Sequence, residues 1–316
     1  EIQASDWSSD VCSSDLDATP AGLTFTIANG VAGATSPDIA GAISVVAAEW
    51  FTDIVCPWTD TTSLAALTTE LARRYTAMNR LDSHAWCGFR GTFSALSTKG
   101  AALNSPFLTA IGANAAPQPG YVWAAALAAV ASFHLANDPA RQLRSLVLPN
   151  IMAPAAPVRF IDSERDLLLR DGISTFTVAV DGSVVLERVI TAYQLTTLGA
   201  PDTAWLDVMV PKTLTRIRWD WATHMALTWP RAKLASDGAL AAEYADNVVT
   251  PRRLHSTWAA RCKLYGRQGW IEDIEATVAA STFQVSESDR NRVDAVQKLK
   301  VIGNLMVLAG ALEFQA

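Results

Sequence analysis

The side chains that could carry acid–base or nucleophilic chemistry are few and widely spaced in this chain. Its histidines are His84, His134, His224 and His255. His84 stands three residues before Cys87, and in one strand this odd spacing directs the two side chains to opposite faces, so they form no dyad. His134 falls in an apolar helical stretch, as a buried core residue would, and the last two fall on polar helical stretches. No HxxxH or HExxH pattern is present, so the histidines predict no metal site.

One pair of carboxylates is a weak candidate for a reactive site. Asp53 and Asp60 flank the end of a predicted strand, with Cys56 between them. They could do acid–base work in the crevice at the carboxyl ends of a parallel sheet. We favour the alternative that Asp60 caps a helix and that Asp53 is solvated. No nucleophile elbow or phosphate loop is present either. We therefore predict no catalytic, cofactor-binding or metal-binding residues and no enzymatic activity, with a hydrolase that uses this crevice as the alternative.

The cysteines, the charge and the hydropathy exclude further classes of protein. Cys56, Cys87 and Cys262 form no CxxC pattern, so we expect reduced, buried thiols in a protein assembled in the cytoplasm. The net charge is −6 without any basic patch, which argues against a nucleic-acid partner. The most apolar stretch, Tyr121–Ala136, is shorter than the ~20 residues of a membrane span and predicts a buried helix, not a membrane contact.

Residues 1–16 differ in character from the rest of the chain. The run DWSSDVCSSDL at residues 6–16 resembles a translated short-read sequencing adapter, because all eleven residues back-translate into one adapter frame. We therefore expect residues 1–16 to be a disordered artefact and the N-terminal part of the protein to be missing. Without the four acidic residues of this segment, the net charge of −6 becomes −2.

Strand-like and helix-like segments alternate between residues 23 and 136, which predicts a parallel sheet with helices on its faces. Ser36, Pro37 and Asp38 indicate the start of a helix that runs to about Trp50, and Asp60 caps the next helix. The predicted strands are Leu23–Ala28, Phe51–Cys56, His84–Cys87 and Phe107–Ile111, and the later helices are Gly91–Lys99 and Gly120–Ala136. We assign residues 17–150 to one α/β domain.

Residues 151–316 are predicted to form a second, α+β domain after a proline-rich break at residues 137–160. Asp181-Gly182 between two β-rich runs is a strong hairpin signal. The predicted elements are a helix at Ser163–Arg170, strands at Ile173–Val180 and Ser183–Ile190, helices at Pro211–Thr228 and from Thr250 to about Tyr265, and β-like segments at Ala276–Ser286 and Val301–Gln315. Tryptophans crowd this half, and we expect one or two of them at subunit interfaces.

Short segments spread in order along the chain carry a resemblance to one family. They are GATSPD (33–38), EW (49–50), IVCPWTD (54–60), DSHA (82–85), RGT (90–92), NSP (104–106), DPAR (138–141), SERDLLL (163–169), DGISTFTV (171–178), ERVIT (187–191), YQ (193–194), GAPDTA (199–204), PR (230–231), KLA (233–235), VTP (249–251), AG (309–310) and Phe314. On these segments the chain resembles the tail sheath proteins of Mu-like contractile phages. Residues 211–222 and 285–300 look less like that family, whose N-terminal third has no counterpart here.

The resemblance implies a subtilisin-like sheath domain in shape only, followed by a C-terminal sheath domain. It also implies a virion subunit that polymerises as stacked hexameric rings around the tail tube and contracts to drive the tube through the host envelope. The implied partners are other copies, linked by exchanged terminal strands, together with tail tube, baseplate and tail terminator proteins. We hypothesise that residues 301–315 pair with a neighbour's sheet, the alternative being a strand within the same subunit. A sheath-type subunit of a type VI secretion or tail-like bacteriocin machine remains a second alternative.

Overall fold

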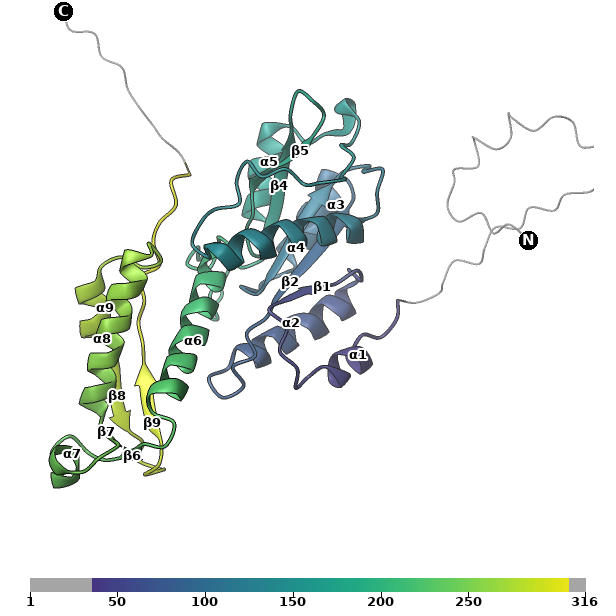
Figure 1. The fold of residues 1–316 in the computed structure, drawn as a ribbon. Helices are drawn as coiled ribbons and strands as arrows, with labels where there is room; N and C mark the ends of the chain where they lie inside the picture. Colours follow the sequence, from purple (N-terminus) through teal and green to yellow (C-terminus); the bar gives the residue numbers. More distant parts are fainter. Residues whose placement is uncertain (1–35, 307–316) are drawn as a thin grey trace, which may run out of the picture. The chain divides into compact units, whose positions relative to one another are not determined.

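The computed structural model describes residues 36–306, so the expectations for residues 1–16, for Leu23–Ala28 and for the last ten residues lie outside it. All of the elements below belong to one unit that begins at Ala40 (Figure 1). The elements up to the hairpin are α1 (Ala40–Val45), β1 (Asp53–Val55), α2 (Thr61–Tyr75), β2 (His84–Arg90), α3 (Phe93–Ala101), β3 (Leu108–Ala113), α4 (Gly120–Asn137), the 3₁₀ turn Ala156–Val158, α5 (Asp162–Arg170), β4 (Ile173–Val178) and β5 (Val184–Arg188). The later elements are α6 (Met209–Thr228), β6 (Lys233–Leu234), α7 (Leu240–Tyr244), β7 (Val248–Val249), α8 (Pro251–Arg267), α9 (Ile274–Ala280), β8 (Thr282–Val285) and β9 (Val293–Val296).

The main sheet has the strand order β1-β2-β3-β4-β5. Its first four strands run parallel, and β5 returns antiparallel to β4 through the predicted Asp181-Gly182 turn, where Gly182 has a φ of +85°. The parallel-dominated α/β sheet is therefore confirmed. Since β4 and β5 lie beyond residue 150, the boundary predicted there falls inside this sheet.

The two edges of the main sheet are unequal. β1 is only three residues long and pairs with β2. The outer side of β5 is covered by residues 145–148, where the Leu148 N–H donates to the Val184 oxygen over 2.9 Å and the Leu186 N–H donates to the Leu146 oxygen over 2.8 Å. This short segment of the proline-rich break therefore continues the ladder beyond β5.

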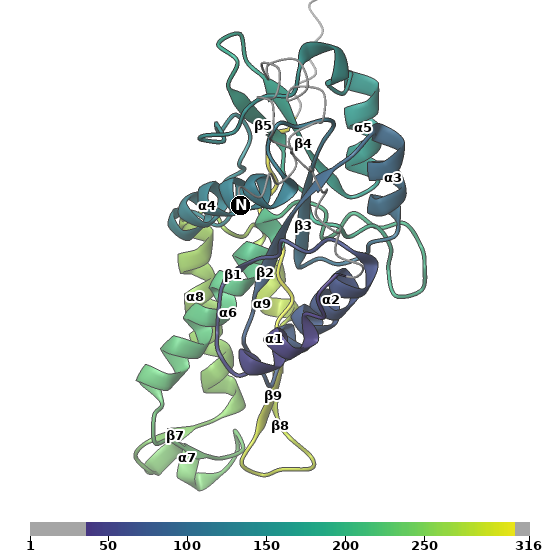
Figure 2. The ribbon, with the colours of Figure 1, turned by 90° about the vertical axis from the view of Figure 1, so that its right-hand side faces the viewer.

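Helices cover both faces of the main sheet, with α4 on one face and α2, α3 and α5 on the other (Figure 2). The core under α4 includes Trp86, Ile111, Trp123 and Leu127. α4 lies very close to β2, because a Cβ added to Gly88 would lie 1.9 Å from the backbone oxygen of Gly120. Only glycine therefore fits at this crossing.

Helix ends follow the predicted signals with one exception. The Asp60 carboxylate accepts the Ser63 N–H over 2.9 Å and starts α2, and Thr250 followed by Pro251 starts α8. The helix expected from Ser36 to Trp50 is wrong in its bounds, because α1 spans only six residues. Arg74 binds the backbone oxygens of Val46 and Glu49 at 2.6 and 2.8 Å. A longer helix would need the Val46 oxygen for its own ladder.

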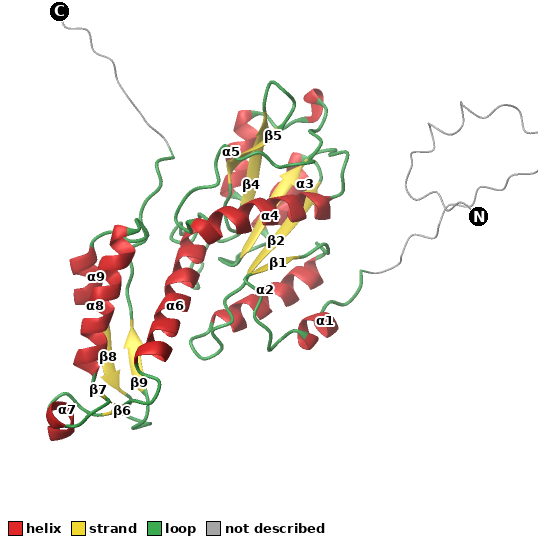
Figure 3. Cartoon of the chain, in the orientation of Figure 1, coloured by secondary structure: helices red, strands yellow, loops and turns green. Residues whose placement is uncertain are grey.

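The second half departs from the prediction near its end (Figure 3). The β-like segment Ala276–Ser286 is helical in α9 as far as Ala280, and only Thr282–Val285 form a strand. The polar run at residues 287–300 contains the strand β9, which pairs antiparallel with β8. This pairing was not predicted, because β9 is only four residues long and lies within a run that is otherwise polar.

A second core forms where α6 and α8 meet. Its buried members include Ile217, Trp258, Cys262 and Tyr265, and Phe283 of β8 packs against them. The Tyr265 hydroxyl donates to the Asp220 carboxylate over 2.5 Å, and the Arg261 guanidinium forms an ion pair with the same carboxylate. None of the described helices is long and apolar enough to span a membrane.

α6 connects the two cores. Met209 at its start is buried in the core of the main sheet, whereas Ile217 belongs to the second core. Between them, Lys212 Nζ lies 2.5 Å from the Asp53 carboxylate, whose other partner is the Trp86 indole N–H at 2.8 Å. Burial lowers the pKa of Lys212. Burial would also raise the pKa of Asp53, but Lys212 and Trp86 stabilise the anion and its pKa is lowered. The pair therefore ties α6 to the first strand of the sheet.

Replacing Lys212 by alanine is expected to lower the free energy of unfolding by about 3 kcal/mol, because Asp53 is left buried without its counter-charge. Urea titration followed by tryptophan fluorescence measures the loss. The double variant Asp53→Asn with Lys212→Met keeps an acceptor for Trp86 and removes both charges, so it should recover most of the stability. Equal losses in both variants would contradict an ion-pair role.

Candidate functional site

The two carboxylates considered as an acid–base pair do not meet. Asp53 is the first residue of β1 and is paired with Lys212, so the expectation that it is solvated is wrong. Asp60 follows the other end of the same strand and caps α2, as expected. Asp53 at the start of β1 and Asp60 after its end thus each have a structural partner, Lys212 for the first and the Ser63 N–H for the second.

His84 is buried at the start of β2 and makes structural contacts. Its Nε2 lies 2.8 Å from Thr109 Oγ1, its Nδ1 has no hydrogen-bond partner, and its ring lies 4.8 Å from that of Trp86. Burial, together with the charge of Lys212, lowers the pKa of His84 to about 3. The imidazole is therefore neutral at pH 7, and no cysteine lies among these contacts.

The remaining candidates are spread over separate elements. His134 is half-buried on α4, His224 lies on α6, and His255 on α8 contacts the Val278 oxygen at 3.0 Å. The thiols of Cys56, Cys87 and Cys262 are free and buried. Within residues 36–306 no three histidine, cysteine or acidic side chains gather as metal ligands. That the protein has no catalytic residue stays a prediction.

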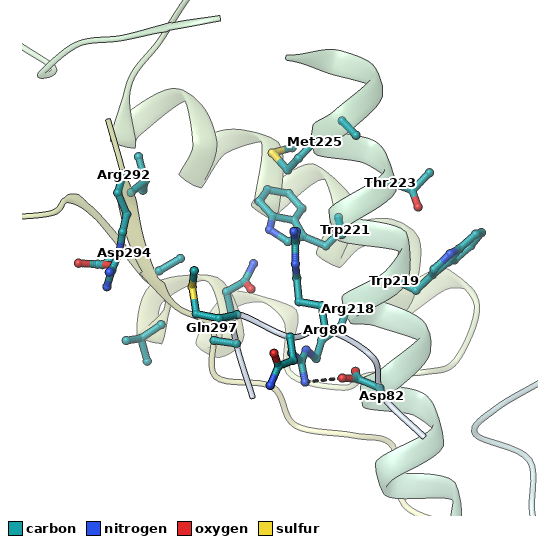
Figure 4. A pocket seen from close by; sticks show the side chains of 18 of the residues that line it. Arg80, Asp82, Arg218, Trp219, Trp221, Thr223, Met225, Arg292, Asp294 and Gln297 are labelled. Carbon is teal, nitrogen blue, oxygen red and sulfur yellow. Dashed lines mark hydrogen bonds and ion pairs between the residues drawn. The ribbon is translucent and has the colours of Figure 1, made fainter. Parts of the chain in front are cut away.

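The structure instead places a groove of about 1090 Å³ beside the second core (Figure 4). Trp50 and three segments line it, and the segments are α6 between Thr215 and Ala226, the loop from Ala77 to Asp82, and the β8–β9 hairpin. We call this the hairpin groove. It brings together residues more than 200 positions apart in the sequence, which no local pattern could have revealed.

Asp82 and Arg218 form the inner wall of the hairpin groove. Arg218 Nη1 lies 2.9 Å from Asp82 Oδ1 and also donates to the Tyr75 oxygen over 2.8 Å, with its guanidinium 4.4 Å from the centre of the Tyr75 ring. Asp82 Oδ1 is buried and accepts no hydrogen bond of good geometry from the described residues, so its contact with Arg218 is an ion pair only. Burial raises the pKa of Asp82 to about 6, against the opposing charge of Arg218.

Aromatic and cationic side chains line the rest of the groove. Trp219 and Trp50 are each about two-fifths exposed, and the Trp50 indole N–H donates to the backbone oxygen of Asp82 over 2.9 Å. Trp221 packs edge-on against Trp258 at 5.2 Å. The crowding of tryptophans in this half indicated a contact surface, and Trp219 is the member that the structure leaves most accessible. Whether it lies at a subunit interface stays a prediction.

Within the described residues, the outer edge of β9 is unpaired and borders the groove. Six consecutive residues from Arg292 to Gln297 line it, so side chains from both faces of β9 take part and the edge of the strand borders the cavity. Among residues 36–306, β9 pairs with β8 alone. A free edge with an adjacent groove is suited to accepting another extended segment.

Comparison with known proteins identifies the family. Residues 32–192 match the model of the phage tail sheath protein central domain. The chain is also 31% identical over 298 residues to the Mu-like prophage FluMu tail sheath protein of Haemophilus influenzae. The chain belongs to the phage tail sheath family. The match covers 94% of this chain but only 61% of the length of the relative.

Solved structures of sheath proteins share the fold. A sheath tail protein from Listeria innocua matches with a TM-score of 0.57 and 13% identity, over 83% of this chain and 56% of that one. A sheath tail protein from Desulfitobacterium hafniense gives 0.52 and 14%, over 83% and 59%. The helical sheath of the anti-feeding prophage in its contracted state gives 0.54 and 13%, over 88% and 73%.

The raised pKa of Asp82 predicts that the unfolding free energy of this sheath protein depends on pH. Its folded-state pKa of about 6 lies above the ordinary value of 3.8, so ionising Asp82 costs the folded state stability. The stability that the neutral Asp82 carboxyl contributes is fully present below pH ~4 and is lost as the pH rises through about 6. Relative to Asp82→Asn, the wild type should lose up to about 3 kcal/mol of unfolding free energy between these limits. Urea titrations across this range measure the difference.

The variant Arg218→Gln is the control for this prediction. Arg218 holds the pKa of Asp82 down, so its removal should shift the transition to higher pH. If the stability profiles of the wild type and Asp82→Asn run parallel, the carboxyl is not perturbed and the prediction fails.

Proposed function

We propose that the chain is the structural subunit of a contractile phage tail sheath, without enzymatic activity. In this proposal it polymerises as stacked hexameric rings around the tail tube and contracts to drive the tube through the host envelope. The free edge of β9 beside the hairpin groove carries the proposal, because it provides a place for strand addition between copies. Membership of the sheath family and the Mu-like relative support it.

The hydrogen-bond phase of the hairpin identifies the groups available for strand addition. The Ser286 N–H donates to the Arg292 oxygen over 2.9 Å, so these two residues are a hydrogen-bonded pair. Such pairs alternate along an antiparallel ladder, which makes Gln284 with Asp294 the next one. The N–H groups of Val293 and Ala295 therefore point away from β8, toward any strand that adds to the edge.

The hypothesis that the C-terminal segment is the added strand has to be narrowed. Val301 forms an antiparallel bridge with Ile271, and the Ile302 N–H donates to the Trp270 oxygen over 3.1 Å. Residues 301 and 302 are thus bound within their own subunit, and the hypothesis that exchange begins at 301 is wrong there. The hypothesis of exchange is kept for the rest of the segment 301–315, of which residues 307–315 lie outside the described part of the chain.

The partners and the domain division follow from the same proposal. The subunit would contact other copies, tail tube, baseplate and tail terminator proteins, would assemble in the host cytoplasm and would reside in the virion. Since the two cores meet within α6, we place the division between a subtilisin-like sheath domain and the C-terminal domain near residues 209–217 instead of 150. A secretion or tail-like bacteriocin sheath is the alternative, and the genes adjacent to this one would distinguish the two.

The variant Ala295→Pro tests strand addition at the hairpin groove. Proline removes one outward N–H of β9 and leaves the ladder with β8 intact, so we expect a folded monomer that forms no tubes. The chain is expressed in its full reading frame, its fold is checked by circular dichroism, and tubes are counted by electron microscopy.

The matched control is Ala295→Val, which keeps the N–H and should form tubes like the wild type. Tubes of normal length from Ala295→Pro would overturn strand addition at this edge. A wild type that stays monomeric at every concentration would overturn the sheath function itself.

Removing residues 307–316 tests the donated strand. The described residues that bind the C-terminal segment, such as Trp270 and Ile271, keep their contacts with residues 301 and 302, so the subunit should fold. We expect polymerisation to be abolished, as measured by sedimentation. Replacing the same ten residues by a Gly-Ser linker should have the same effect, and tubes from either variant would contradict the proposal.

A further inference from the structure

α4 has a composition unlike that of a helix at a protein surface. Its 18 residues, Gly120–Asn137, include no lysine, arginine, aspartate or glutamate. A helix that is apolar on all sides is normally buried on all sides. In this structure α4 lies on the outside of the main sheet, with a single face against it.

The exposure of α4 repeats with every turn of the helix. Trp123, Ala124, Leu127 and Ala131 point into the core. The exposed positions Tyr121, Ala125, Ala129 and Phe133 recur every four residues. Since residues four apart share one face of a helix, these four side chains form one continuous row. We call it the α4 stripe.

The ends and the middle of the α4 stripe differ in shape. Tyr121 is 53% exposed and Phe133 is 68% exposed, whereas the two positions between them are alanines. Two aromatic side chains thus flank a low, flat stretch that another backbone could approach closely. Half-buried Val122, Ala126 and Val130 adjoin the row and are also apolar.

The other helices of the sheet mix polar and apolar side chains on their exposed faces, with Leu167 exposed on α5 and Ala72 on α2. On α5 the exposed residues include Asp162, Asp166 and Arg170. On α2 they include Thr61, Thr62 and Thr69. The α4 stripe differs from these surfaces in its two exposed aromatic side chains and in lying on a helix that has no charged side chain on any face.

We propose that the α4 stripe is a contact between copies of this chain, which takes an uncharged strip of a second copy in the assembled polymer. Twelve residues of helix span ~18 Å, and with a helix width of ~10 Å the row covers on the order of 200 Å². A stable pair needs about 800 Å² per partner, so this row alone cannot hold a separate protein. In a polymer every copy repeats the contact and other contacts add to it. The proposal rests on the proposed self-assembly of the sheath subunit.

The variant Ala129→Glu tests the α4 stripe in the full reading frame. A charge in the middle of the row would be buried without a partner, so we expect the concentration needed for polymerisation to rise about tenfold or more. Ala129 is exposed, so circular dichroism and the urea midpoint of the monomer should not change. The control Ala72→Glu places the same charge on an exposed alanine of α2, on the opposite face of the sheet, and should polymerise like the wild type.

A cross-link identifies the occupant. A benzophenone amino acid replaces Phe133, and isotope-labelled and unlabelled subunits are mixed before assembly. Cross-linked peptide pairs of mixed label would support a second copy, whereas pairs of one label only, or cross-links to tube protein, would overturn the proposal. Wild-type polymerisation by Ala129→Glu would also overturn it while leaving the sheath function intact. If the wild type itself does not polymerise, both proposals fail.

Discussion

The arrangement of the described chain depends on the position of α6, which is set by ion pairs with the elements on both of its sides. Lys212 pairs with Asp53 at the start of β1, and Arg218 pairs with Asp82 in the loop before β2. Asp220, on the same helix, binds Arg261 of α8. Breaking a buried pair by removing one partner is costly, so each contact fixes α6 against one side. The hairpin groove exists because the helix is held between these two sides.

Much of the fold could be predicted from local pattern. Asp60, Thr250 and the Asp181-Gly182 turn act through neighbours a few residues away, so their effects can be read from the sequence alone. The alternation of strands and helices gave the parallel sheet for the same reason. Prediction failed where contacts between residues far apart in the sequence determine the structure. Arg74 of α2 binds the Val46 oxygen just after α1 ends, and β9 is a strand because β8 pairs with it.

The candidate site was harder to predict than the fold. The search for reactive groups singled out Asp53 by its distance from Asp60 along the chain, but its partner Lys212 lies 159 residues away. Asp82 appeared only as the first residue of the DSHA segment and Arg218 in no segment, so nothing in the sequence indicated that the two pair. Only the crowding of tryptophans indicated that a contact surface would lie in this half. Backbone pairing, which we propose for the hairpin groove, requires no particular side-chain chemistry, so the sequence of such a surface contains little that a motif can reveal.

The two edges of the main sheet bear on the fidelity of assembly. A chain that joins its copies through backbone ladders risks joining them at the wrong ladder. β1 offers only three residues, and residues 145–148 already occupy the outer side of β5. The five-stranded sheet is thus a poor template for a foreign strand. In the proposed assembly, the strand edges that the chain keeps from pairing would therefore direct growth as much as the edge that it offers.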